Sequence, residues 1–263
     1  MEGSDRAPWF LGDLDDPWVV AIADAIPRAR RFHHPDDLPD SWPIDGVAPP
    51  AVILHRRHLT VADAHRVVGL RSRWERPPRI ILCVGPQARY ADVECWSRLV
   101  EVVIPEATAL DTVARHALES GSAPRAGGNR PRVALVSTDR ELRVALAETC
   151  RSAGYLAEAR RDWSELAPDC PVVWDVPVLE AGWGAQLSRR ATTSTVVALL
   201  GFADRATVRA SRAAGASACL ELPCDSADLI ATLDRVVSRP RIEPAHSTPP
   251  PPMGSRLASN LKR

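Results

Sequence analysis

The sequence predicts two small α/β domains in tandem, each with a doubly wound parallel sheet. Apolar runs of strand length alternate with segments whose apolar residues recur at helical spacing, and this alternation is typical of a parallel sheet covered by helices on both faces. The same order of segments occurs twice along the 263 residues, which indicates a duplicated domain. Two stretches without apolar periodicity set the boundaries of the copies.

The first of these stretches, 119–131, is rich in Gly, Ser, Pro and Arg, and the second, 239–263, contains four consecutive prolines. Segments of such composition bury too little apolar surface to offset the entropy of ordering the chain. We therefore expect a flexible linker at 119–131 and a disordered tail at 239–263. The two domains are then 6–118 and 132–238.

Three pairs of positions support the duplication, because their separation along the chain is nearly constant. They are Asp15 with Asp139, Gly85 with Gly201, and Pro105 with Pro223, at offsets of 124, 116 and 118. A near-constant offset over a whole domain is expected when one unit has been copied.

In the first domain the pattern starts with a strand at 9–12 and a helix from Pro17, because proline favours the first helical position and Asp15 and Asp16 precede it as candidate caps. The remaining expected strands are 51–54, 79–85 and 99–104, and the remaining expected helices begin at Thr60 and cover 107–118.

In the second domain the expected strands are 132–136, 170–176, 194–201 and 218–222. The first helix follows Ser137, where Thr138 and Glu141 have capping-box spacing and Asp139 is also placed to begin the helix. Two further helices are expected at 206–214 and 226–237, the latter with an apolar face.

Composition argues against several classes of protein. The chain has 33 basic and 33 acidic residues, whereas binding to nucleic acid through phosphate contacts needs a basic surplus. The apolar runs are far shorter than the ~20 residues of a membrane helix, and we expect no secretory signal, because the first eight residues have no apolar region. The six cysteines form no CxxC pair, so we interpret them as buried apolar residues in a reducing compartment, the cytoplasm.

Enzyme motifs and the tryptophans complete this survey. The sequence contains no GxSxG, GxGxxG or P-loop, and Gly182-Trp-Gly184 has neither a third glycine nor an evident helix start after it. Trp18 and Trp174 are expected in the core. Four tryptophans in polar or Pro-rich surroundings are candidates for a partly exposed binding face; they are Trp42, Trp74, Trp96 and Trp183.

The segment 215–230 (GASACLELPCDSADLI) resembles the closing segment of the receiver domain of two-component response regulators, the CheY-like family. That family carries a Gly-Ala pair, an aromatic residue, a Lys-Pro pair and a leucine at similar spacing. The segments 51–54 and 171–175 are similar to its central strand. The resemblance covers both domains and implies a flavodoxin-like, doubly wound fold for each.

The family implies five functional side chains at the strand ends: two acids that hold Mg²⁺, a phosphoacceptor aspartate, a Ser or Thr, and a Lys. In the second domain the acceptor position is Asp175. The acid pair falls on Ser137 and Thr138, with Asp139 assigned instead to the helix start, and the last two positions are Leu200 and Leu222.

In the first domain the acceptor position is His55, and Asp13, with Asp15 nearby, is the candidate acid. The Ser/Thr and Lys positions fall on Val84 and Ile104. The only lysine of the chain, Lys262, lies in the predicted tail, so neither domain has a switch lysine. We therefore expect two degenerate receivers, or pseudo-receivers, that bind no Mg²⁺ and no other cofactor.

Other readings of the same residues stay open. Asp175 is either a true phosphoacceptor of an atypical receiver or a strand-end aspartate that hydrogen-bonds a loop. A ligand near Asp13, His55 or Asp175 would make the chain a small-ligand sensor or an enzyme on this fold. A metal site is disfavoured, because its candidates do not have the spacing of four ligands; they are His33, His34, His55 and His58.

We expect a non-enzymatic, cytoplasmic protein of two-component signal transduction or a phosphorelay that acts through protein–protein interaction. A histidine kinase or another signalling protein is the expected partner, and membranes and nucleic acid are not. In the resembled family the last strand and helix form the usual partner surface, which implies 102–118 in the first domain and 220–237 in the second.

Overall fold

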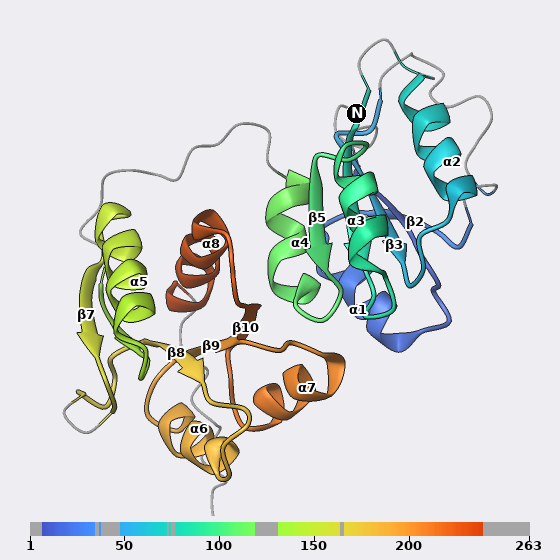
Figure 1. The fold of residues 1–263 in the computed structure, drawn as a ribbon. Coiled ribbons are helices and arrows are strands. Elements are labelled where there is room, and N and C mark those ends of the chain that lie inside the picture. The colour runs from blue at the N-terminus through green and yellow to red at the C-terminus, as the bar shows by residue number, and fades with distance from the viewer. Residues whose placement is uncertain are drawn as a thin grey trace, which may run out of the picture.

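The computed structural model describes residues 7–34, 37, 48–72, 74, 77–118, 131–163 and 166–238, which form two parallel sheets flanked by helices (Figure 1). The predicted tail and all but Pro131 of the predicted linker lie outside the described residues, as does Trp42. None of the described helices is long and apolar enough to cross a membrane.

The first sheet has five strands in the order β2-β1-β3-β4-β5, all parallel. Its strands are β1 (Trp9–Leu11), β2 (Arg30–Phe32), β3 (Ala51–Arg56), β4 (Arg79–Val84) and β5 (Val102–Pro105). Its helices are α1 (Pro17–Asp24), α2 (Val61–Ser72), α3 (Tyr90–Ser97) and α4 (Ala109–Leu118).

The second sheet repeats this order as β7-β6-β8-β9-β10, again all parallel. Its strands are β6 (Arg132–Val136), β7 (Leu156–Arg160), β8 (Val172–Val176), β9 (Val196–Leu200) and β10 (Ala218–Glu221). Its helices are α5 (Arg140–Ser152), α6 (Trp183–Ala191), α7 (Arg205–Ala213) and α8 (Ser226–Val237). The predicted pair of doubly wound, flavodoxin-like domains is therefore confirmed.

Two kinds of element were absent from the prediction. The edge strands β2 and β7 are half-exposed or exposed at most positions and contain arginines, so they lack the apolar run by which buried strands are recognised. The short helices α3 and α6 were also missed, and α6 begins at Trp183, next to Gly182, whose φ of 86° is left-handed. The expectation that no helix starts there is wrong, because a glycine adopts this conformation at little cost.

The tryptophan predictions are partly wrong. Trp18 and Trp174 are buried, as expected. Trp74 and Trp96 are also buried, at 8% and 4% exposure, and Trp74 packs edge to face against Trp9 with ring centroids 5.8 Å apart. They fill the core under α2 and α3, so they form no exposed binding face.

The cysteines are free thiols, and four of the six are buried, as predicted: Cys83, Cys150, Cys170 and Cys219. Burial raises the pKa of the Cys150 thiol to about 12. At neutral pH this thiol is protonated and behaves as a small apolar side chain.

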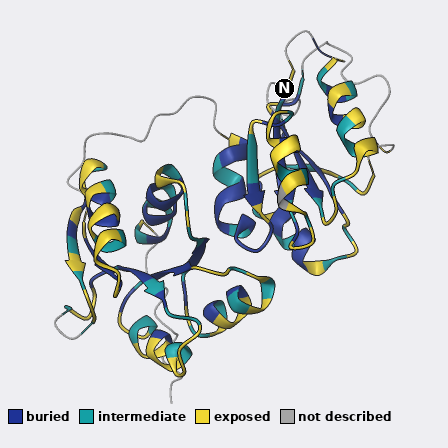
Figure 2. Cartoon of the chain, in the orientation of Figure 1, coloured by how far each residue is buried: buried dark blue, intermediate teal, exposed yellow. Residues whose placement is uncertain are grey.

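One of the apolar core clusters spans both domains. A single cluster of buried side chains includes Val113 and Ala117 of α4 together with Ala216 and Cys219 of the second domain. Helix α4 packs on its own sheet and also against α8 and β10, and Figure 2 shows it as buried along most of its length. The segments predicted as separate partner surfaces, 102–118 and 220–237, thus lie against each other.

Charged contacts hold α4 and α8 together. Asp111 of α4 is 8% exposed and accepts hydrogen bonds from Arg212, from Arg235 (2.7 Å) and from the backbone N–H of Cys219 (2.8 Å). In return, Asp228 of α8 accepts a hydrogen bond from Arg115 (2.6 Å). The contacts of Asp111 with Arg235 and of Asp228 with Arg115 each join the first turn of one helix to the last half of the other, so α4 and α8 run antiparallel.

Candidate functional site

The backbone register of the two sheets defines which strand-end residues are equivalent. In β3, His55 pairs with Cys83, one residue before the end of β4; in β8, Asp175 pairs with Leu199, one residue before the end of β9. His55 and Asp175 therefore occupy the same position in the two sheets. The carboxyl ends of such parallel strands are where ligands usually bind in doubly wound folds.

The position of Leu222 is taken in the first sheet by Glu106. The N–H of Leu222 donates to the carbonyl of Leu200 (2.9 Å), and the N–H of Glu106 donates to the carbonyl of Val84 (2.8 Å). Matching Pro105 with Pro223 had pointed to Ile104 instead, and that alignment is off by two residues. Ile104 is 3% exposed and belongs to the apolar core.

A buried histidine–carboxylate pair fills the strand ends of the first sheet. His55 Nε2 lies 2.5 Å from Glu106 Oε2, and the two residues are only 2% and 1% exposed. Two glycines make room for the pair: a Cβ on Gly12 would lie 3.0 Å from the Cβ of His55, and a Cβ on Gly85 would lie 3.2 Å from Glu106 Oε2. At these two positions the packing leaves no space for a side chain larger than glycine's.

The second domain supplies a cation to this pair. Arg205, the first residue of α7, donates from Nε to Glu106 Oε1 and lies 2.7 Å from Asp16 Oδ2. Arg57 approaches the same Asp16 oxygen at 2.5 Å. We call these five residues, His55, Glu106, Arg205, Asp16 and Arg57, the interdomain ion cluster.

Trp18 completes the contact between the domains. Its indole N–H donates to the backbone carbonyl of Glu106 (3.2 Å), and the guanidinium groups of Arg205 and Arg209 lie 5.8 and 5.1 Å from the centre of its ring. Such cation–π contacts add attraction between an arginine and an aromatic face. The start of α7 is thereby held over the strand ends of the first sheet.

The carboxylates of the cluster stay ionised. Burial would raise the pKa of Glu106, but hydrogen bonds from His55 and Arg205 outweigh it and lower the pKa to about 2. Burial would likewise raise the pKa of Asp16, and contacts with Arg205, the N–H of Trp18 and Arg57 lower it to about 2. A cavity of about 270 Å³ lies beside the cluster, between Arg57, Pro86, Gln87, Glu106 and Arg205.

The acids predicted for the first domain lie away from the buried pair. Asp13 and Asp15 are exposed, and Asp13 Oδ1 accepts a hydrogen bond from the N–H of Asp15 (3.2 Å). Asp13 also lies 3.8 Å from Arg57. Asp16, treated in the sequence only as a helix cap, does cap α1 through the N–H of Trp18 and is in addition the acid that joins the cluster.

The strand ends of the second sheet are simpler. Ser137 Oγ donates to Asp175 Oδ2 (2.7 Å) and accepts a hydrogen bond from the N–H of Asp139 (3.0 Å). Asp139 caps α5 through the N–H of Leu142, so its assignment to the helix start is confirmed. Thr138, the other candidate cap, is exposed.

The remaining predicted positions carry no polar group. Leu200 is fully buried, and Leu222 and Val84 are partly buried.

Of the histidines weighed as metal ligands, His33, His34 and His58 are exposed, whereas His55 is bound to Glu106. Over the described ranges, no three His, Cys, Asp or Glu side chains are grouped as metal ligands would be.

Sequence reasoning missed Glu106 and Arg205. Glu106 had a usable signal, because it is an acidic residue directly after an apolar strand. Arg205 had none, since its partners are 99 and 189 residues away in the sequence, and only the docking of the two domains brings them together.

Comparisons with known proteins found no matching family model and no matching curated protein. Among solved structures, the chain is similar to a response regulator from Thermotoga maritima, at 17% identity and a TM-score of 0.37, over 42% of this chain and 99% of that one. It is also similar to the C-terminus of E. coli RcsC, with its linker region and phosphoreceiver domain, at 13% identity and a TM-score of 0.35, over 90% of this chain and 94% of that one.

Proposed function

We propose that this chain is a non-catalytic, cytoplasmic signalling protein in which two receiver-like domains have lost phosphoryl transfer and act by binding other proteins. The observation that carries the proposal is the interdomain ion cluster. In the first domain His55 stands at the acceptor position and Glu106 at the lysine position, and Arg205 already neutralises the buried charge.

The second domain supports the same conclusion. Phosphoryl transfer depends on cations that balance the charge of the transferred group. Beside Asp175 the chain offers the hydroxyl of Ser137, while Leu200 and Leu222 take the places of the remaining polar groups. A phosphoryl group on Asp175 would lack the magnesium ligands and the lysine that stabilise it in the resembled family.

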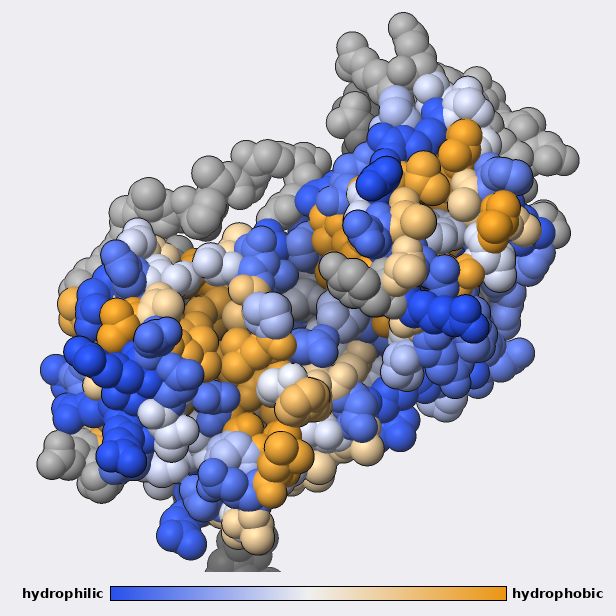
Figure 3. Space-filling model, viewed as in Figure 1, coloured by the Kyte–Doolittle hydropathy of each residue, from blue (hydrophilic) through white to orange (hydrophobic). Residues whose placement is uncertain are grey.

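Binding of proteins is supported by exposed apolar side chains. Leu179 and Phe202 follow β8 and β9 at the carboxyl edge of the second sheet and are 87% and 71% exposed. Figure 3 shows apolar surface on the second domain between α5 and α7. Because the last helices α4 and α8 cover each other, a partner would meet the two domains as one body.

The test uses the full chain with Mg²⁺ and beryllofluoride, a phosphoryl mimic that requires no kinase, followed by backbone NMR. We expect no saturable chemical-shift changes beyond those caused by Mg²⁺ alone, and no gain of a phosphoryl mass on incubation with acetyl phosphate. Saturable shifts around Asp175, together with a mass gain that disappears in Asp175→Asn, would establish the alternative reading of an atypical, phosphorylatable receiver.

A further inference from the structure

A groove in the second domain lies between α6 and the connection from β7 to β8. Parallel strands are joined by crossover connections that usually contain a helix, but the described residues of this connection, 161–163 and 166–171, are not helical. The described residues that cover the face of the sheet at this point therefore belong to irregular chain. The groove encloses a cavity of about 590 Å³, within the range of roughly 300–1,000 Å³ typical of small-molecule sites.

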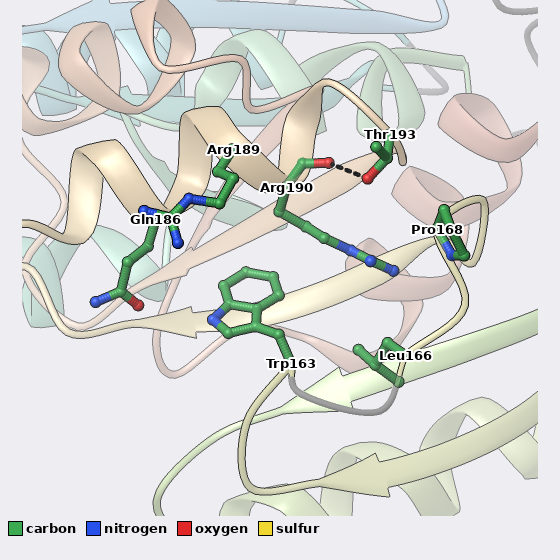
Figure 4. Close-up of a pocket in the computed structure, with 7 residues that line it drawn as sticks. All are labelled: Trp163, Leu166, Pro168, Gln186, Arg189, Arg190 and Thr193. Atoms are coloured by element: carbon green, nitrogen blue, oxygen red, sulfur yellow. Dashed lines mark hydrogen bonds between the residues drawn. The ribbon is translucent and has the colours of Figure 1, made fainter.

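One wall of the groove is apolar and aromatic. The ring of Trp163 packs edge to face on Trp174 of β8, with centroids 4.3 Å apart, and this contact fixes the indole in place. Leu166 and Pro168 extend the same wall (Figure 4). A planar ring inserted here would contact Trp163 through the stacking geometries that aromatic pairs prefer.

The opposite wall is cationic. It is formed by the last turns of α6 and the residues after it, with Gln186, Arg189, Arg190 and Thr193 facing the cavity, and none of the described residues of the lining is a carboxylate. The nearby Asp169 acts on Arg190 through its charge but is not part of the lining.

Arg190 is pre-positioned for an anion. One terminal nitrogen of its guanidinium donates to the carbonyls of Ala167 (2.7 Å) and Cys170 (3.2 Å). Its Nε is buried and has no hydrogen-bond acceptor in the described part of the chain, so the terminal nitrogens are the donors that a ligand in the groove can reach. A guanidinium held by part of its donors pays little further entropy when it binds an anion.

We propose that this groove binds a small molecule with a planar ring and an anionic group, such as an aryl phosphate or an aryl carboxylate. The ring packs on Trp163, and the anion binds at the cationic wall to which Arg189 and Arg190 belong. Phosphates and carboxylates are the groups that arginine binds best. This site lies apart from the acceptor positions of both sheets, and the proposal does not rest on the proposed function.

The first test is calorimetric titration of the full chain with phenyl phosphate and with benzoate. Benzyl alcohol, which has the ring without the charge, and inorganic phosphate, which has the charge without the ring, serve as comparison ligands. We expect one saturable site for at least one aryl anion, with affinity at least tenfold above that of either comparison ligand. Absence of saturable binding for both aryl anions, or equal affinity for a comparison ligand, would overturn the proposal.

The second test assigns the site to this groove. Arg189→Gln changes an exposed side chain and Trp163→Leu removes the aromatic wall; each should weaken binding at least tenfold, with thermal denaturation showing that the variants are folded. Arg140→Gln is the matched control, because Arg140 is exposed at the start of α5, which packs on the other face of the sheet. Binding that neither groove variant weakens would also overturn the proposal.

Discussion

At the carboxyl ends of the strands, the polar side chains of the first sheet are buried and Asp175 of the second is only half-buried, although the two sheets have the same strand order and register. In the first, His55 and Glu106 are almost completely buried beneath Arg205. In the second, Asp175 stays half-buried with Ser137 as its side-chain partner. Duplicated positions in one fold have thus acquired different electrostatic environments.

The difference arises from how the domains are docked. Helices α7 and α8 and strand β10 of the second domain make the contacts, and they meet α1, α4 and the strand ends of the first. Docking of this kind treats the two copies unequally, because it places α7 over one set of strand ends. Four predictions test this asymmetry, from the largest expected effect to the smallest.

Asp111→Ala should remove the largest amount of stability. It leaves Arg212, Arg235 and the N–H of Cys219 without their shared acceptor in a buried interface, and breaking a buried charged network costs roughly 3–5 kcal/mol. Urea denaturation measures the loss. As a control, Asp139→Ala removes an exposed helix cap, worth about 1 kcal/mol. Equal losses for the two variants would contradict a firmly docked interface.

Low pH should destabilise the His55–Glu106 pair at the strand ends of the first sheet. The pKa of Glu106 is lowered from 4.5 to about 2, so in that range the folded state binds fewer protons than the unfolded state. The stabilisation is complete above about pH 5 and disappears as the pH falls towards 2, in total roughly 3 kcal/mol. The difference in unfolding free energy between the native chain and Glu106→Gln should shrink by that amount between pH 5 and pH 2. A constant difference would show that Glu106 is not held as an ion.

Arg205→Ala should lower the free energy of unfolding by about 2 kcal/mol, because it removes charged hydrogen bonds from two carboxylates at the strand ends of the first sheet. Arg209→Ala is the matched control: Arg209 shares the contact with Trp18 and loses only a cation–π contact of about 0.5–1 kcal/mol. Denaturant melts compare the two variants. If Arg209→Ala proves the more damaging, the ion cluster is not what joins α7 to the first domain.

Ser137→Ala should have the smallest effect, about 1 kcal/mol, since it removes one hydrogen bond to the half-buried Asp175. Thr138→Ala, at the exposed neighbouring position, should leave the unfolding free energy unchanged. Thermal denaturation at neutral pH compares them. A loss at Ser137 as large as that of Arg205→Ala would mean that the strand-end contacts of the second sheet stabilise the fold as much as the interdomain ion cluster of the first.

The sequence by itself determined the repeated α/β pattern, the inner strands, and the helix starts near Asp15–Asp16 and Thr138–Asp139, of which Asp16 and Asp139 are the caps. These features are local, because apolar runs and capping residues act over a few positions. The edge strands β2 and β7 escaped it, since a half-exposed strand of three to five residues has no apolar run. The burial of Trp74 escaped it for a related reason: its polar neighbours in sequence are not its neighbours in space.

Only the tertiary structure decided how the strand ends are occupied. The backbone pairing shows that Glu106, and not Ile104, is equivalent to Leu222. The docking of α7 brings Arg205 to Glu106, which is 99 residues away in the sequence. It also turned the two expected partner surfaces against each other. Such contacts depend on the packing of two complete domains, so neither copy, read alone along the sequence, specifies them.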